Sequence, residues 1–335
     1  AVTALPERLL RAAMGRAVAS PGRLRALAWA WWVAQRTGLA PRLAGWVGVA
    51  ASRSLWRQRA AAVAETVLAL PAARLPWQLW AQARSRGNGA AGVALFAGCV
   101  QELFFSPVNR AAARVLAALG YPVRILVGGG CCGAVHAHLG MPEVAARLAR
   151  RNIEAFERAG VDYVVVNAAG CGSTLKEYGH LLADDPKWAE RARAFSARVR
   201  DVSELLASLS LRGSLGRIEA KVTYSDPCHL AHGQRVREQP RQLLRSIPGV
   251  ELVELNQADW CCGSAGIYNI TQPELSKRIL TMKVDNVAAS GAEILATGNP
   301  GCAIQIAAGC RARGLAIEVV HPIDLLDRAY QAAEA

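Results

Sequence analysis

Eight of the nine cysteines of this 335-residue chain fall into two sets of four that repeat with almost the same spacing. In the first set the outer cysteines lie 32 and 39 residues from a central adjacent pair, and in the second 33 and 40 residues. The first set is Cys99, Cys131, Cys132 and Cys171, and the second is Cys228, Cys261, Cys262 and Cys302. Because thiolates bind zinc and iron–sulfur clusters, each set is a candidate binding site for one metal group.

The adjacent cysteine pair in each set favours an iron–sulfur cluster over a zinc ion. Zinc ribbons usually take Cys-X-X-Cys pairs, whereas neighbouring side chains diverge and suit a group with several separated irons. A glycine follows each pair, Gly133 and Gly263, and we expect it to remove a β-carbon where the backbone passes the cluster. The glycines at 128–130 are expected to do the same. Zinc and redox-active disulfides stay open as alternatives.

Other chemistry-bearing residues lie near the two sets. His136 and His138 follow the first pair, and His229 and His232 follow Cys228. They are expected to be turn or helix-cap residues, or else to tune a cluster by hydrogen bonding to sulfur. The ninth cysteine, Cys310, lies outside the repeat and is expected to be a core residue. The sequence contains no GxGxxG motif or P-loop that would bind a nucleotide.

The elements around the two sets also repeat, with short apolar runs alternating with helical patterns. Strands are expected at 93–97, 123–127, 163–166 and 198–202, and again at 222–225, 251–255, 293–296 and 317–321. Helices are expected at 109–119, 143–159, 238–246 and 274–290, with a short helix after each last strand and a turn at each last cysteine. This alternation predicts parallel sheets, and every cysteine position follows a strand. We therefore expect the thiols of each set to converge at one sheet edge.

The net charge of +13 is concentrated at the start of the chain. Residues 1–90 hold thirteen arginines, two glutamates and seven of the nine tryptophans, a net charge of +11. Tryptophan beside arginine is typical of a membrane surface, but the charge-free runs 26–35 and 43–52 are half the roughly twenty residues of a spanning helix. Packing of the tryptophans on a neighbouring domain or subunit is the alternative. Nucleic acid is not expected, because no recognised binding motif accompanies the charge.

The predicted organisation is an α/β chain of two tandem parallel-sheet, cysteine-rich units behind a helical basic extension. The expected domains are 1–90, 91–215 and 216–335, with a linker over 84–92. Residues 1–19 carry four charged side chains and no continuous apolar core, which is unlike a signal peptide. We therefore expect a cytoplasmic protein, in which clustered cysteines are metal ligands.

The segments around the cysteines resemble the tandem CCG domains of heterodisulfide reductase subunits, lactate-utilisation proteins and glycerol-3-phosphate dehydrogenase subunits. The resemblance lies in 96–100 (FAGCV), 130–134 (GCCGA), 167–173 (NAAGCGS), 226–230 (DPCHL) and 260–266 (WCCGSAG). Within this superfamily, 175–179 (LKEYG), 229–234 (HLAHGQ) and 267–273 (IYNITQP) are most similar to the iron–sulfur subunit family of bacterial glycolate oxidase (glycolate dehydrogenase). The resemblance covers about residues 90–330.

This resemblance implies one iron–sulfur cluster per unit, of the 4Fe–4S type, bound by the eight cysteines, with no catalytic residue on this chain. It also implies flavin-binding dehydrogenase subunits that carry FAD and oxidise glycolate to glyoxylate. This chain would then pass electrons toward a membrane quinone, at the inner face of the membrane. A heterodisulfide-reductase-like or lactate-linked redox protein and a zinc-stabilised scaffold remain as alternatives.

The sequence departs from these families in two places. No cysteine precedes Cys99, so the ferredoxin-like region with two 4Fe–4S clusters that the glycolate oxidase family leads us to expect is absent from this sequence. Thr174 and Gln305 occupy the places where heterodisulfide reductase subunits have a fifth cysteine. The second departure weakens the disulfide-reductase alternative.

Overall fold

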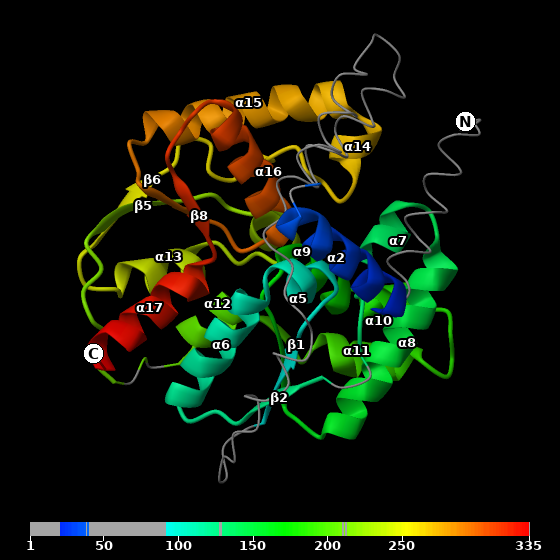
Figure 1. Ribbon diagram of the computed structural model, residues 1–335. Coiled ribbons are helices and arrows are strands. Elements are labelled where there is room, and N and C mark those ends of the chain that lie inside the picture. The colour runs from blue at the N-terminus through cyan, green and yellow to red at the C-terminus, as the bar shows by residue number, and fades with distance from the viewer. Residues whose placement is uncertain are drawn as a thin grey trace.

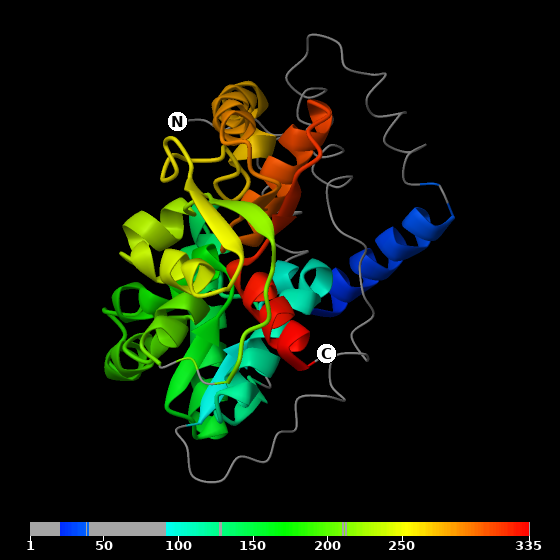
Figure 2. The same cartoon turned by 90° about the vertical axis from the view of Figure 1, so that its left-hand side faces the viewer.

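The computed structural model describes residues 21–37, 39, 92–126, 129–209, 211 and 213–334. Most of the basic extension and of the predicted linker lies outside these residues. Within the extension the structure describes helix α2, Pro21–Arg36, which projects away from the rest of the molecule in Figure 2. In the described part of the chain, no helix combines the length and the apolar character that crossing a bilayer requires.

The chain from residue 92 onward builds two four-stranded sheets in which every strand pairing is parallel (Figure 1). The first sheet has the order β2-β1-β3-β4 and the second has the equivalent order β6-β5-β7-β8. Their strands are β1 Val93–Phe96, β2 Val123–Ile125, β3 Tyr163–Val166 and β4 Val199–Asp201, then β5 Ala220–Tyr224, β6 Val250–Glu254, β7 Ile294–Ala296 and β8 Glu318–Val320. The predicted fold class, two tandem parallel-sheet units, is confirmed.

The helices repeat in the same way. The first unit contains α5 Val100–Phe104, α6 Ser106–Ala118, α7 Ala134–His138, α8 Pro142–Ala159, α9 Ala169–Lys176, α10 Tyr178–Leu181, α11 Ala189–Ser196 and α12 Val202–Ala207. The second contains the π-helix η2 His229–Gly233, α13 Glu238–Arg245, α14 Tyr268–Thr271, α15 Pro273–Ala289, α16 Pro300–Ala312 and α17 Pro322–Glu334. The four longer helices predicted from the sequence correspond to α6, α8, α13 and α15.

The expectation of a turn at the last cysteine of each set is wrong. Cys171 and Cys302 lie in the first turns of helices α9 and α16. The small residues and glycines around them are typical of a turn. A helix start was therefore not predicted at either cysteine. Pro300 at the first position of α16 is a helix-start signal that identifies one of the two.

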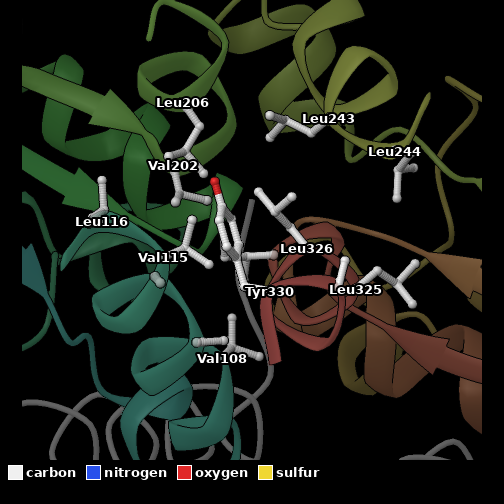
Figure 3. Close-up of a cluster of buried hydrophobic side chains, with 14 of the residues drawn as sticks. Val108, Val115, Leu116, Val202, Leu206, Leu243, Leu244, Leu325, Leu326 and Tyr330 are labelled. Carbon is white, nitrogen blue, oxygen red and sulfur yellow. The ribbon is translucent and has the colours of Figure 1, made fainter. Parts of the chain in front are cut away.

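The two units share one apolar core, which lies between the two sheets. Along β1, Val93 and Leu95 face this core, whereas Ala94 and Phe96 face a separate core on the outer side of the first sheet. Helices α6 and α12 of the first unit and α13 and α17 of the second fill the shared core. Figure 3 shows their side chains around Tyr330 of α17. The units are therefore fused through their helices rather than joined by a flexible linker.

Contacts between the units follow an approximate two-fold pattern. Helix α6 packs against α17, and α12 packs against α13, so each unit contributes the same two helices. An ion pair across the junction joins Arg114 Nε to Asp327 Oδ1 at 2.8 Å. The Asp327 side chain is buried, which makes this pair part of the interface rather than of the surface.

We predict that loss of one side chain from the shared core destabilises both units together. Leu326→Ala removes a fully buried side chain and is expected to lower the free energy of unfolding by about 2–5 kcal/mol. Urea denaturation followed by circular dichroism measures this change and should show one transition. Leu275→Ala, at a side chain 46% exposed, is the matched control with a small effect. Two separated transitions in the variant would contradict a shared core.

Candidate metal centres

The structure brings the four cysteines of each predicted set to the carboxyl edge of one sheet. In the first unit, Cys99 precedes α5, the pair at 131–132 lies between β2 and α7, and Cys171 is in the first turn of α9. In the second unit, Cys228 precedes η2, the pair at 261–262 follows β6, and Cys302 is in the first turn of α16. All eight are free thiols. The convergence expected from the parallel sheets is observed.

The first set forms a series of thiol contacts from Cys99 to Cys131, Cys132 and Cys171. The hydrogen bond with Cys131, together with burial, raises the pKa of Cys99 well above its usual value. The hydrogen bond with Cys132 is the main cause that raises the pKa of Cys131, to about 12. For Cys132, contact with Cys131 lowers the pKa, but contact with Cys171 and burial produce a net rise. The raised pKa values favour protonated thiols at Cys99, Cys131 and Cys132, whose protons are released when a metal cation binds.

The second set forms the same series, but negative charge is favoured at two of its sulfurs. Hydrogen bonds from Cys228 and Cys262 lower the pKa of Cys261. A hydrogen bond from Cys262 and a second from the Asn299 amide lower the pKa of Cys302 against the effect of burial. Cys228 and Cys262 donate the thiol hydrogen bonds, and both have raised pKa values, chiefly because of their contact with Cys261.

The glycine after each cysteine pair donates a backbone hydrogen bond to sulfur. The Gly133 N–H lies 3.4 Å from Cys131 Sγ, and the Gly263 N–H lies 3.3 Å from Cys261 Sγ. N–H groups aimed at a ligand sulfur stabilise its negative charge and tune a cluster bound there. This feature is common to both units.

The same two glycines are required by the packing of the following helix. Both adopt positive φ angles, +90° at Gly133 and +88° at Gly263. A β-carbon on Gly133 would lie 3.1 Å from Ala145 Cα, and one on Gly263 would lie 2.6 Å from the Ser276 carbonyl oxygen. The close neighbour is therefore the helix that follows, α8 or α15, and the expectation that the glycine also leaves room for a cluster stays a prediction.

Two further polar contacts with sulfur occur in the second unit. The Asn299 amide nitrogen donates to Cys302 Sγ at 3.4 Å, and His229 Nδ1 lies 3.6 Å from Cys228 Sγ, where the histidine tautomer decides which group donates. Asn299 is the residue that caps α16, and the residue in the same position before α9 is Ala168, which has no polar side chain. The two centres therefore differ in the polar side chains that contact their sulfurs, although their cysteines correspond.

The centres lie next to one another because α9 packs against η2 across the junction. The Gln234 side chain donates to the Ala169 carbonyl at 2.9 Å, and the Ala169 N–H donates to the Gly298 carbonyl at 3.1 Å. The Gly170 N–H donates to Asn299 Oδ1 at 3.1 Å. Asn299 therefore contacts the backbone beside the first set and a sulfur of the second.

The predicted histidines have different surroundings. The ring of His138 stacks on that of His229 across the junction, with centroids 5.9 Å apart. His136 is buried in α7. His232 is exposed and hydrogen-bonds to Arg237 Nη2 and to the Asp259 carbonyl. The contact of His229 with the Cys228 sulfur supports the predicted tuning role.

The remaining cysteine and the two positions of a fifth ligand have structural contacts. Cys310 lies on α16 and is buried in an apolar core that includes residues of α15, as expected, and burial raises its pKa to about 11. The Thr174 hydroxyl donates to the Gly170 carbonyl, and the Gln305 amide donates to the Ser276 hydroxyl. Neither of these two positions offers a thiol to its centre.

The donor set fits an iron–sulfur group by its chemistry. Each centre offers four thiols with an adjacent pair, mostly shielded from solvent, and an N–H donor at the first cysteine of the pair. Within the described part of the chain, no three or more His, Cys, Asp or Glu side chains are already placed closely enough to hold a metal ion. Zinc therefore stays open as the alternative.

These two centres, each at the edge of a parallel sheet, are the defining feature of a known class. Residues 93–176 and 222–307 match the cysteine-rich domain family, CCG. The two matches cover just over half of the chain, and each covers the first three strands of one sheet in chain order, β1 to β3 and, from Val222 onward, β5 to β7. The chain belongs to the CCG family.

Three individual relatives are similar to this chain over most of its length. The chain is 44% identical over 238 residues to the "Probable glycolate oxidase iron-sulfur subunit" of Bacillus subtilis, covering 70% of this chain and 54% of that protein. It is 32% identical over 331 residues to the "Glycolate oxidase iron-sulfur subunit" of Escherichia coli, covering 98% and 73%. It is 30% identical over 242 residues to "Lactate utilization protein A" of an Exiguobacterium species, covering 72% and 99%. The chain therefore spans about half the length of the first of these relatives.

We predict that Gly263→Ala destabilises the chain more than Gly140→Ala does. Both glycines have positive φ, which costs a residue with a β-carbon about 1 kcal/mol, but the space around Gly140 is open. The additional cost at Gly263 comes from the Ser276 carbonyl oxygen. Urea unfolding of the metal-free variants measures both changes. Equal losses would show that conformational strain alone accounts for the glycine.

Proposed function

We propose that this chain is the iron–sulfur electron-transfer subunit of a flavin-dependent 2-hydroxy-acid dehydrogenase that acts on glycolate. Each cysteine set binds one cluster of the 4Fe–4S type. Flavin-binding partner subunits carry FAD and oxidise glycolate to glyoxylate, and the electrons pass through this chain toward a membrane quinone. The complex is cytoplasmic, and the basic residues 1–90 contact the membrane surface or a partner.

The observation that carries this proposal is the contact between helices at the two cysteine sets. Helix α9 carries Cys171, the last cysteine of the first set. It packs against η2, which follows Cys228, the first cysteine of the second set. Two groups of thiols at one junction suit the movement of single electrons between neighbouring clusters. The likeness to two subunits named for glycolate oxidase supports the choice of substrate.

The residues of this chain hold and shield the clusters rather than act on glycolate. The thiolates bind iron, and the glycine N–H groups donate hydrogen bonds to the sulfurs of Cys131 and Cys261. The buried sulfurs of the second position in each pair lie against the outer apolar cores, which exclude water. A bound iron–sulfur cluster supplies one-electron redox chemistry, and the chemistry on the 2-hydroxy acid belongs to the partner's flavin.

Lactate is the second candidate substrate of the complex. The alignment with the Exiguobacterium lactate utilization protein covers 99% of that protein, so the two CCG units account for nearly all of it. Glycolate and lactate are both 2-hydroxy acids, and the partner that binds them decides between them. Purification of the complex and comparison of the two substrates distinguishes these candidates.

We predict that loss of one ligand removes one cluster. Cys131→Ser is expected to lower the bound iron and sulfide of the full chain by about half, because all four ligands of a centre come from one unit. Cys261→Ser should have the same effect on the other centre, and Cys310→Ser is the control that keeps both. Iron and sulfide analysis after anaerobic purification, with electron paramagnetic resonance, measures the result. A full complement of iron in both ligand variants would refute the assignment of the ligands.

We also predict that the chain has no glycolate-oxidising activity by itself but restores electron flow to flavin subunits that lack it. The measurement is glycolate-dependent reduction of a dye, with and without the flavin subunits. The Cys131→Ser and Cys261→Ser variants should restore less activity than the unaltered chain, and Cys310→Ser should restore as much. Dye reduction by the chain alone, in the absence of flavin, would exclude the electron-transfer role.

A further inference from the structure

The helices that follow the two cysteine pairs differ at one buried position. The glycine after each pair approaches Ala145 of α8 in the first unit and Ser276 of α15 in the second, so these two residues correspond. Seven residues further along each helix, Asn152 corresponds to Lys283. The two-fold pattern thus places a neutral side chain beside one centre and a lysine beside the other.

Both of these side chains hold the loop that leads into the cysteine pair. Asn152 is 1% exposed, and its amide donates to the Cys131 carbonyl at 3.0 Å. Lys283 is 2% exposed, and its Nζ donates to the carbonyls of Gln257 and Ala258 at 2.8 and 3.0 Å. Both side chains hydrogen-bond to backbone at or just before a cysteine pair, but the lysine adds a positive charge.

The charge on Lys283 is influenced by the second cysteine set. Burial lowers the pKa of Lys283 on balance, and negative charge on Cys262 and Cys302 opposes this shift. The carboxylates of Asp226 and Asp259 follow as weaker influences in the same direction.

Both carboxylates are already engaged by arginines. Asp226 accepts from two nitrogens of Arg241, at 2.7 and 2.9 Å, and Asp259 is paired with Arg237 at 3.3 Å. Among the ion pairs formed by the described residues, none includes Lys283. A buried ammonium is costly unless an opposite charge compensates it. The thiolates of the second set are the compensating charge that the structure leaves for it.

We propose that Lys283 is the buried counter-charge of the second centre and makes the second cluster the more easily reduced of the two. This inference rests on the proposed function, in which both centres hold clusters. A nearby positive charge stabilises the form of a cluster that has gained one electron, and no bond is made or broken in that step. Electrons from the flavin partner therefore collect at the second centre.

The hydrogen bonds to sulfur favour the same direction independently. Asn299 and His229 contact sulfurs of the second centre, whereas Ala168 occupies the place of Asn299 in the first. Hydrogen bonds to ligand sulfurs raise the reduction potential of a cluster. They do not involve Lys283, so substitution of the lysine tests its charge separately.

The experiment is a dithionite titration of the full chain, followed by electron paramagnetic resonance, which gives the midpoint potential of each cluster. The Cys131→Ser variant isolates the second centre and Cys261→Ser isolates the first. We expect the isolated second centre to be reduced at the higher potential. Lys283→Met should lower that potential and should leave the potential of the isolated first centre unchanged.

Three further variants separate charge from packing. Lys277→Met removes a charge from an exposed position of the same helix and should change neither potential, because solvent screens it. Lys283→Arg keeps the charge and should keep the potential. Lys283→Gln keeps a hydrogen-bond donor without the charge and should behave like Lys283→Met.

Each outcome either supports or overturns the proposed role of Lys283. If Lys283→Met and Lys283→Gln lose the second cluster while Lys283→Arg keeps both cluster and potential, the requirement is for charge and the inference stands. An unchanged potential in the neutral variants, loss of the cluster in all three Lys283 variants, or a higher potential at the first centre overturns it. Absence of iron from the unaltered chain would instead reject the proposed function itself.

Discussion

Burial of four helices between two sheets is the constraint that fixes both cysteine sets. Helices α6, α12, α13 and α17 each face the shared core, so neither sheet can move without exposing apolar side chains of the other unit. The carboxyl edges of the sheets are thereby held in one relative position. The contact between α9 and η2, and with it the closeness of the two centres, follows from this packing.

Buried polar side chains add local rigidity where the apolar core ends. The Tyr178 hydroxyl donates to the Cys132 carbonyl at 2.7 Å and accepts from the Asn152 amide. In the second unit, Arg241 reaches both Asp226 and Glu254 from a nearly buried position. Such bonds set the path of the backbone around the thiols before any metal binds, which reduces the ordering that binding would otherwise require.

The spacing of the cysteines predicted two units, and the alternation of apolar runs with helical patterns predicted parallel sheets and the convergence of each set, because these features depend on local patterns and on their repetition. The helix starts at Cys171 and Cys302 were not predicted, because small residues there resemble a turn, although Pro300 is a helix-start signal for the second. It also gave no indication of Lys283, since a lysine in a helical pattern is ordinarily a solvent-facing residue. Asn299 was missed because its two contacts lie in different units and depend on how the units pack.

The two-fold relation between the units has a consequence for how such a protein can diverge. In a symmetric pair of identical chains, every substitution near one centre also occurs near the other, and the two centres must remain equal. Fusion of both units into one chain removes that restriction, so position 152 can be asparagine while position 283 is lysine. Duplication followed by fusion is therefore a route by which the two equivalent sites of a symmetric fold come to have different surroundings.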